Sequence, residues 1–534
     1  MQPKYIFMTG GVCSGLGKGI TAASLGRLLK ARGYKVTIQK FDPYINMRPG
    51  LLNPLQHGEV YVTEDGAEVD LDLGHYERFI DENLSVNNSV SAGKIYWEVL
   101  NNERRRVYKG RTIQVIPHIT DAIKSYIRRA SQNSQSDIII SEIGGTVGDI
   151  ESLPFCEAIR QISQDEGRKN VMYVHVTLVP YLTFADEMKT KPSQHSVKEL
   201  LSLGIKPDAI VCRTEKPMSD EMREKMAQFC NVDKDCVIEN PNVDCLYELP
   251  LILEKQRFAD IVCERLGLDS PAPDLTVWES LVEQSKNITR EIKIGLVGKY
   301  TELWDAYLSV LEAVKHAGIF HNVNIRLERI NANDLTGKNA ANKLKDLKGI
   351  LVPSGYGKRD VEGLISAARY ARENRVPFLG IGQGMQCAVI EFARNAAGIK
   401  DANTAEENPE AAAPVIESMD NSFGTEIGEL QPMRLGAYPC KLTPETLLQE
   451  AYGESLIYER FRHLCKVNNQ YRGEITSHGL IESALSPDEQ HVEAIELPRD
   501  IHPWFVGVQF RPEFKSRITR PSPLFKAFIG ACLV

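Results

Sequence analysis

The chain has 534 residues, of which 43% are hydrophobic and 25% are charged, and a formal net charge of −8. This length predicts two or more domains with buried cores, and the negative charge argues against non-specific binding to nucleic acid or to an anionic membrane surface. The eleven cysteines include no CxxC pair, so the sequence indicates neither a zinc site nor a disulfide framework. With no secretory h-region and no apolar run of membrane-spanning length, we expect a cytoplasmic protein.

The chain begins with a strand, a glycine-dense loop and a helix. Residues 5–9 are an apolar run typical of a buried parallel strand, and residues 21–32 show helical spacing of apolar side chains. The loop between them is rich in glycine and carries Lys18. Glycine N–H groups, a helix start and a lysine together favour phosphate binding. The usual spacing is not met, since Gly19 follows the lysine where Ser or Thr is usual, and a plain glycine turn is the alternative.

A second strand is predicted over residues 35–39. Lys40 and Asp42 follow it, at the strand end where open α/β sheets place ligand contacts. Residues 63–78 then hold a dense run of carboxylates that includes Asp72. Such carboxylates repel each other and any bound triphosphate, so a magnesium ion between them would explain their density. A solvated acidic loop is the alternative.

Further strands are predicted over residues 136–141, 171–178 and 209–213, alternating with helical segments. The first of these runs into Glu142, where a second metal ligand is expected in phosphate-loop proteins. The spacing of Lys189 and Lys191 suits a triphosphate, although a solvated basic turn would look similar. Alternating strands and helices predict an α/β fold with a doubly wound parallel sheet.

Several segments of this half closely resemble the synthetase half of CTP synthase. These segments are residues 5–20, 40–46, 56–60, 64–79, 114–120, 142–154, 189–201 and 229–232. The resemblance continues to the carboxyl end and so covers essentially the whole chain. It implies a P-loop-type amidoligase in which ATP phosphorylates O4 of UTP, ammonia attacks C4, and phosphate leaves to give CTP.

The resemblance also implies roles for individual residues. Lys18 and Lys40 would be catalytic and hold ATP phosphates, and Asp72 and Glu142 would bind Mg²⁺. The residues implied to bind nucleotide are Ser14, Gly15, Leu16, Gly17, Gly19, Ile20, Gln114, Asp149, Glu151, Lys189, Lys191, Arg213, Lys225 and Asp244. Within that set, the residues implied to hold UTP phosphates are Gln114, Lys189, Lys191 and Lys225.

His57 with Val60 matches the family's ammonia-entry gate. The resemblance further implies a homotetramer built on the synthetase half, with filaments as a further form and the nucleotide site between subunits. ATP and Mg²⁺ are the implied cofactors, and UTP and ammonia or another amine are the implied substrates.

This half also departs from the family pattern. Gly15 replaces a second serine of the glycine loop, Arg48 occupies a usually acidic position, and Leu51 replaces a small polar residue. Further departures occur at residues 103–110, which include Arg106 and Lys109, and at residues 184–186, which include Phe184 and Asp186. They add bulk and positive charge, and both neutral drift and an altered acceptor site remain open.

The predicted synthetase domain spans residues 1–266, and residues 267–291 are predicted to form a linker that begins proline-rich. A second α/β domain with a doubly wound parallel sheet is predicted over residues 292–534. It resembles a class I glutamine amidotransferase, which hydrolyses glutamine to ammonia. That chemistry needs a cysteine nucleophile, a histidine to activate it, a carboxylate to orient the histidine and donors for the oxyanion.

Most of these parts are missing. Gly382 stands where the nucleophilic cysteine is expected, and Arg511 stands where the histidine is expected. Arginine stays protonated, so Arg511 cannot act as a general base. Glu513 alone remains of the triad, and Ser354 replaces an oxyanion-loop glycine. The basic run that helps to hold glutamine is broken by replacements at Phe461, Leu464 and Cys465.

Cys387 is the thiol nearest in sequence to the missing nucleophile and the candidate to replace it. It lies five residues after Gly382, where helical geometry turns it away from the loop and toward the core. A buried, inert cysteine is therefore expected, and we predict that glutaminase activity is absent.

Two further stretches have structural predictions. Residues 401–428 have little periodicity and are predicted to form a mobile loop. Residues 220–237 are predicted to form a helix over the nucleotide site.

Three functions remain open on the sequence. The favoured one is a CTP synthase-like ligase that uses ammonia or another amine. The second is the same ligase chemistry on a changed substrate, and the third is a non-catalytic, nucleotide-binding and self-assembling relative. The phosphate and metal constellation favours the first two.

Overall fold

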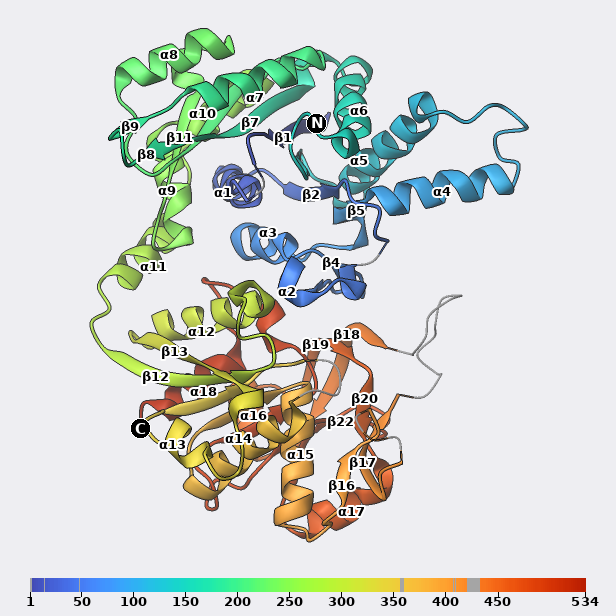
Figure 1. Cartoon of the computed structure of the whole chain (residues 1–534), viewed down its shortest axis with the longest axis vertical. Helices are drawn as coiled ribbons and strands as arrows, with labels where there is room; N and C mark the ends of the chain where they lie inside the picture. The colour runs from blue at the N-terminus through green and yellow to red at the C-terminus, as the bar shows by residue number, and fades with distance from the viewer. Residues whose placement is uncertain are drawn as a thin grey trace. The chain divides into compact units, whose positions relative to one another are not determined.

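The computed structural model describes residues 2–13, 15–47, 49–355, 360–406, 408, 410–419 and 433–534. They form two compact units (Figure 1). Unit 1 consists of Met1–Pro49 and Asp72–Val282, and unit 2 consists of Gly50–Leu71 and Glu283–Val534. The sequence predicted contiguous domains, whereas the structure places residues 50–71, here called the inserted segment, with the second unit. The other unit boundary falls within the predicted linker.

Unit 1 contains a seven-stranded sheet with the order β11-β10-β7-β1-β6-β2-β5, and its strand pairs are parallel. The strands are β1 (Lys4–Gly10), β2 (Val36–Asp42), β5 (Ser89–Ser91), β6 (Ile138–Ile143), β7 (Val171–Val179), β10 (Ala209–Thr214) and β11 (Val237–Pro241). These strands are almost wholly buried, as expected for a parallel sheet that is covered on both faces. All five strands predicted from the sequence are present, which confirms the predicted α/β class.

The helices that follow these strands cover the sheet (Figure 1). They are α1 (Lys18–Ala31), α3 (Asp72–Ile80), α4 (Ala92–Arg104), α5 (Thr120–Ser134), α6 (Leu153–Asp165), α7 (Lys191–Ser202), α8 (Asp220–Cys230), α9 (Leu249–Lys255) and α10 (Phe258–Leu266). The next helix, α11 (Thr276–Lys286), contains the end of unit 1 at Val282. A short hairpin is formed by β8 (Tyr181–Leu182) and β9 (Glu187–Met188). Helix α8 ends earlier than predicted because Asn231 takes a left-handed conformation that caps it.

Unit 2 has a nine-stranded mixed sheet with the order β13-β12-β14-β15-β23-β22-β21-β18-β19. The strands are β12 (Glu291–Gly298), β13 (Asn324–Asn331), β14 (Gly349–Val352), β15 (Phe378–Ile381), β18 (Arg434–Leu442), β19 (Leu456–His463), β21 (Ile481–Leu485), β22 (Val492–Glu496) and β23 (Phe505–Val508). The part from β13 to β23 is parallel, as predicted. The remaining pairs are antiparallel, which the sequence analysis did not predict.

The helices of unit 2 flank this sheet (Figure 1). They are α12 (Leu308–Phe320), α13 (Ala340–Leu344), α14 (Val361–Asn374), α15 (Gln383–Asn395), α16 (Leu447–Tyr452), α17 (Asn469–Ser477) and α18 (Pro523–Cys532). The apolar core lies between these helices and the sheet.

The prediction of a mobile loop over residues 401–428 is wrong where the structure describes that stretch. It contains β16 (Ala402–Thr404) and β17 (Ala413–Ser418), which form a small sheet with β20 (Cys465–Val467). Val415 and Ile416 are buried in the core of unit 2, and this tertiary packing orders a run too short to show periodicity. Residues 407, 409 and 420–428 lie outside the described residues.

The inserted segment leaves unit 1 after Pro49 and returns to it at Asp72. It contains the short helix α2 (Pro54–His57) and a hairpin of β3 (Tyr61–Val62) with β4 (Glu68–Val69).

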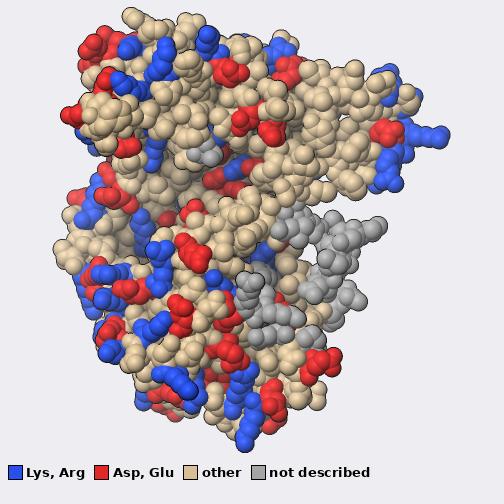
Figure 2. Space-filling model, in the orientation of Figure 1, with Lys and Arg blue, Asp and Glu red and all other residues tan. Residues whose placement is uncertain are grey.

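Among the described residues, no helix combines the length and the apolarity that crossing a membrane requires. On the face of each unit shown in Figure 2, acidic and basic side chains are interspersed, and the described part of that face shows no stripe of one sign.

Candidate functional site

The glycine-dense loop connects β1 to α1, as the sequence predicted. Gly17 is the N-cap of α1 and has a φ of 83°, and Gly15 has a φ of 74°. This left-handed conformation strains other residues, which explains glycine at both positions. Leu16 is buried and Ile20 is half-buried. Ser14, which was predicted to bind nucleotide, lies outside the described residues.

Two lysines come together at the carboxyl ends of the central strands of unit 1. Lys18 Nζ donates a hydrogen bond to the carbonyl oxygen of Gly145 at 2.5 Å. Lys40 Nζ pairs with Asp72 and lies 3.7 Å from Asp42 Oδ1. Burial lowers the pKa of Lys18, and the positive charge of Lys40 adds to this effect, while nearby carboxylates oppose it. The site therefore places two lysine side chains, paired with carboxylates, where polyphosphate is expected.

The predicted metal ligands lie beside these lysines. Glu142 is on β6 directly opposite Lys40 of β2, and Asp72 begins α3. The hydroxyl of Tyr76 donates a hydrogen bond to Glu142 Oε2. Burial raises the pKa of Glu142, and the two lysines counter this effect. Tyr76 was not predicted as a site residue, although its position one helical turn after Asp72 places both side chains on the same face of α3.

Gly19 keeps the space between the two carboxylates open. A Cβ atom at this position would lie 2.8 Å from Asp72 Oδ1 and 3.2 Å from Glu142 Oε2, so both oxygens face the same point. The described residues contain no group of three or more His, Cys, Asp or Glu that could hold a metal. Two carboxylates fit Mg²⁺, which commonly takes one or two from the protein and the rest of its shell from phosphates and water.

Arg213 is the one distant nucleotide-binding candidate for which the structure records proximity to the glycine loop. It lies on β10, its guanidinium Nη1 is 4.0 Å from where a Cβ of Gly17 would be, and it donates a hydrogen bond to Asn240 at 3.3 Å. Asp149 and Glu151 are exposed in the turn after β6, where Asp149 Oδ2 accepts a hydrogen bond from the backbone of Thr146 at 3.3 Å.

The remaining nucleotide-binding candidates are spread over separate elements. Gln114, Lys191, Lys225 and Asp244 are exposed, and Lys189 is half-buried. Lys189 pairs with Glu187 of its own hairpin. Among the described residues, no recorded hydrogen bond or ion pair joins these five side chains to Lys18 or its neighbours. The structure therefore leaves their assignment to UTP as a prediction.

The predicted ammonia gate lies in the inserted segment. His57 is exposed at the end of α2 and Val60 is half-buried. Between them, Glu59 is buried: its backbone N–H donates to Asp305 at 2.8 Å and its Oε2 accepts from the backbone N–H of Ser309 at 2.9 Å. The sequence analysis assigned no role to Glu59.

The degenerate glutaminase positions follow three neighbouring parallel strands of unit 2. Ser354 follows β14, Gly382 follows β15, and Arg511 and Glu513 follow β23. Gly382 has a φ of 55° and a ψ of −109°. A Cβ atom at this position would lie 2.6 Å from the Oγ atom of Ser354. Ser354 therefore fills the space beside the turn that would carry a nucleophile.

Arg511 is buried and engaged in ion pairs. Its Nε donates to Glu513 Oε1 at 2.5 Å, and a guanidinium nitrogen lies 3.9 Å from Glu59 Oε1. The guanidinium also lies over the ring of Phe514, 4.7 Å from its centre. Glu513 thus holds an arginine in the place where a histidine was expected.

No substitute thiol is indicated. Cys387 is 1% exposed and belongs to the core on α15, as predicted. Burial raises the pKa of Cys465 to about 12, so this thiol is protonated near neutral pH. The arginines of the broken basic run contact the inserted segment, since Arg460 pairs with Glu64 and Arg462 with Glu68.

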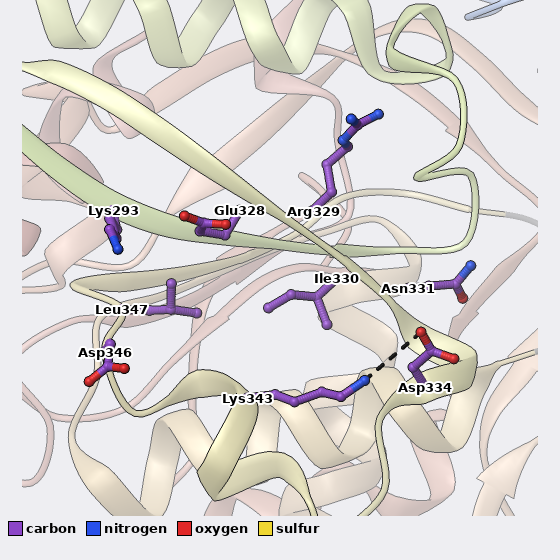
Figure 3. Close-up of a pocket in the computed structure, with 9 residues that line it drawn as sticks. All are labelled: Lys293, Glu328, Arg329, Ile330, Asn331, Asp334, Lys343, Asp346 and Leu347. Atoms are coloured by element: carbon purple, nitrogen blue, oxygen red, sulfur yellow. Dashed lines mark ion pairs between the residues drawn. The ribbon is translucent and has the colours of Figure 1, made fainter.

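A separate surface cleft of about 370 Å³ lies between β13 and α13. Figure 3 shows Lys343 pointing toward Asp334, its ion-pair partner at 3.9 Å. The residues that line the cleft include none of the candidates predicted from the sequence. It is a polar surface feature and adds nothing to the site.

Comparison with known proteins agrees with this arrangement. The model of the CTP synthase N-terminus family matches residues 4–268, and the class-I glutamine amidotransferase model matches residues 302–531. Fold and site together define an ATP-dependent ligase unit joined to a class I glutamine amidotransferase unit.

Curated relatives narrow this class. A CTP synthase of Ruminiclostridium cellulolyticum is 57% identical over 532 residues, covering 99% of both chains. One from Geobacillus kaustophilus is 58% identical over 531 residues, again covering 99% of both. The Trypanosoma brucei CTPS glutaminase domain with bound acivicin is 34% identical over 45% of this chain and 94% of that domain, with a TM-score of 0.42. The chain belongs to the CTP synthase family, whose reaction is the ATP-dependent amination of UTP to CTP.

Proposed function

We propose that this chain makes CTP from UTP with ammonia taken from solution, and that it does not use glutamine. The observation that carries this proposal is the pair of replacements at Gly382 and Arg511. A glycine cannot form a thioester, and a protonated guanidinium cannot accept the proton of a nucleophile. Ser354, which fills the space beside the turn, supports the same interpretation.

The roles proposed for the synthetase unit follow from its charge distribution. Lys18 and Lys40 would neutralise ATP phosphates, while Asp72 and Glu142 would hold Mg²⁺. When bound, Mg²⁺ would offset the negative charge of the phosphates. The two buried lysines stabilise the charge that develops on the transferred phosphoryl group, and the hydroxyl of Tyr76 holds Glu142 in place.

We further propose that UTP binds between copies of the chain. Gln114, Lys189, Lys191 and Lys225 would hold its phosphates, and Asp149 and Glu151 would face the pyrimidine nucleotide. Their exposure on separate elements is compatible with a site that a second subunit completes, as in the proposed homotetramer. His57 with Val60 would form the ammonia entry.

A ligase is favoured over a non-catalytic scaffold, because a scaffold would not require two buried lysines facing two carboxylates. Phe184 and Asp186, where an altered acceptor was considered, lie on the same stretch of chain as Lys189. Phe184 is 87% exposed, and Asp186 pairs with Lys216 at 3.2 Å, so the nucleotide products decide between UTP and a changed acceptor.

The test is isotope transfer in two parallel reactions with ATP, Mg²⁺ and UTP. One reaction contains glutamine labelled with ¹⁵N at its amide together with unlabelled ammonium, and the other contains ¹⁵N-ammonium. We expect labelled CTP only in the second reaction. Lys18→Ala should lower that product at least about 100-fold, while Lys35→Ala, an exposed lysine away from the site, should not.

Transfer of label from glutamine, with free ammonium held unlabelled, would overturn the proposal. If neither reaction gave CTP while ATP still bound, the non-catalytic alternative would replace it. Mass analysis of all nucleotide products would reveal a changed acceptor.

A further inference from the structure

The glutaminase position that lost its histidine now carries a buried charge that faces the inserted segment. Arg511 is 5% exposed and Glu59 is 5% exposed, and a guanidinium nitrogen lies 3.9 Å from Glu59 Oε1. Both side chains belong to unit 2. The carboxylate is also fixed from its other side, because Oε2 accepts the hydrogen bond from the backbone of Ser309.

Arginine is suited to this contact in a way that histidine is not. Its guanidinium is permanently charged and planar, so it can meet two carboxylates and lie on an aromatic ring at the same time. Arg511 does all three, with Glu513, Glu59 and Phe514. An imidazole is shorter and is largely neutral near pH 7.

Phe514 extends the contact to the hairpin of the inserted segment. Its ring packs against Tyr61 with centres 4.8 Å apart, and its carbonyl oxygen accepts a hydrogen bond from the Tyr61 hydroxyl at 2.8 Å. Arg460 donates to the Tyr61 hydroxyl at 2.9 Å. The former glutaminase edge thus holds both Glu59 and the strand that follows it.

The inserted segment leads directly to the ligase chemistry through the chain. Glu59 lies two residues from His57 of the proposed ammonia gate, and the segment ends one residue before Asp72. Asp72 pairs with Lys40. If the inserted segment became less ordered, the backbone would pass that change to the proposed ammonia gate and to Asp72 of the candidate metal site.

We infer that Arg511 is a positioning residue, which holds the inserted segment in the conformation that admits ammonia from solution. The effect of Arg511 on the use of ammonia rests on the proposed function. The contact between Arg511 and Glu59 does not depend on that function. A position that served glutamine hydrolysis in the family pattern would here serve the use of ammonia.

The experiment uses the protein of residues 1–534 and five variants. Arg511→Met removes the charge and keeps most of the aliphatic stem, and Arg511→Lys keeps a charge. Glu59→Gln removes the opposite charge, and the double change Arg511→Met with Glu59→Gln completes a cycle. Arg372→Met is the matched control, because Arg372 pairs with the buried Glu391 at 2.8 Å elsewhere in unit 2.

The first readout is amide hydrogen exchange in peptides that cover residues 50–71. Arg511→Met and Glu59→Gln should each speed exchange there by about tenfold. The double variant should exchange no faster than Arg511→Met, because both changes break the same contact, and Arg511→Lys should recover part of the protection. Arg372→Met should leave these peptides unchanged.

The second readout is CTP formation from ammonium. Arg511→Met should raise the KM for ammonium at least about threefold and leave the KM for ATP unchanged.

Unchanged exchange in residues 50–71, or additive effects in the double variant, would overturn the inference. If Arg511→Met did not fold, Glu59→Gln and Arg511→Lys would decide. If the unmodified protein formed no CTP from ammonium, the proposed function would be wrong. The exchange data would still test whether Arg511 and Glu59 hold the inserted segment.

Discussion

At residue 382, glycine provides no side chain, and Ser354 occupies the space that a side chain there would need. The turn keeps a φ of 55° and a ψ of −109°, a conformation that costs energy for any residue other than glycine. A nucleophile in this family position must bear that strain, and glycine removes it. A Cβ atom at residue 382 would contact the Oγ atom of Ser354. The two residues together explain why adding a thiol alone cannot rebuild the site.

We predict that Gly382→Ala destabilises unit 2 by about 1–3 kcal/mol, because it adds both backbone strain and contact with Ser354 Oγ. The added change Ser354→Gly should recover the part due to contact. Gly453→Ala is the control: Gly453 has a φ of 71°, and a Cβ there would meet nothing within 4 Å, so it carries strain alone. The measurement is urea unfolding of each variant.

Equal losses for Gly382→Ala with and without Ser354→Gly would show that Ser354 does not fill the turn. Rebuilding glutaminase activity requires several changes at once. Gly382→Cys, Ser354→Gly and Arg511→His would all be needed, and the last of these removes the contact between Arg511 and Glu59.

At the scale of elements, the sequence predicted what depends on local pattern. Strand β1, the loop and α1 were predicted because an apolar run, glycines and helical spacing follow one another over about 25 residues. The carboxyl ends of β2 and β6 brought Lys40 and Glu142 together, as strand order in an open sheet requires. Tyr76 was missed because only the structure reveals that its hydroxyl reaches Glu142.

Elements that depend on distant packing were not predicted. The hairpin of β3 and β4 is held by Arg460 and Phe514, whose contacts with it span 396 and 453 residues of sequence. No local pattern predicts such contacts. The antiparallel half of the unit 2 sheet and strand β17 were missed for the same reason. Their apolar runs are short, and burial against the rest of unit 2 decides their structure.

Strand β7 provides a prediction about pH. His175 lies between Thr9 of β1 and Ser196 of α7, at 2.9 Å and 2.7 Å. Burial lowers its pKa to about 3, and Lys18 acts in the same direction. An unfolded histidine titrates near pH 6.5. Between these values the unfolded chain binds the extra proton, so stability falls as the pH falls.

From about pH 6.5 to about pH 5, this single histidine should lower the free energy of unfolding by about 1.5 kcal/mol. Glu142, whose pKa burial raises, acts in the opposite direction. The variant His175→Gln should lose the histidine contribution and keep that of Glu142. Urea unfolding at both pH values measures the difference, with the exposed His195→Gln as control. An identical pH dependence in His175→Gln would contradict the assignment.

At the scale of the whole molecule, the two units are not two consecutive pieces of chain. Unit 2 includes residues 50–71, whose two ends continue into unit 1. Ion pairs of Glu64 and Glu68 with Arg460 and Arg462 hold this segment in unit 2. A ligase that has lost its glutaminase would still need unit 2, because that unit orders a loop lying between Lys40 and Asp72 in the sequence. If glutaminase activity is absent, as we propose, this ordering is a physical reason for such a ligase to keep unit 2.

The last prediction follows from this arrangement. A fragment of residues 1–282 should keep the parallel sheet of unit 1, since all seven strands and their covering helices are present. Its inserted segment would lack every partner in residues 283–534, so protease should cut within residues 50–71 at least about tenfold faster than in the full chain. Formation of CTP from ammonium should fall in parallel, although ammonia would need no glutaminase.

Adding residues 283–534 as a separate chain should restore protection if the contacts described for Tyr61, Glu64 and Glu68 hold the segment. A fragment that resisted cleavage in residues 50–71 and kept full ammonium-dependent activity would show that unit 2 orders nothing the ligase requires.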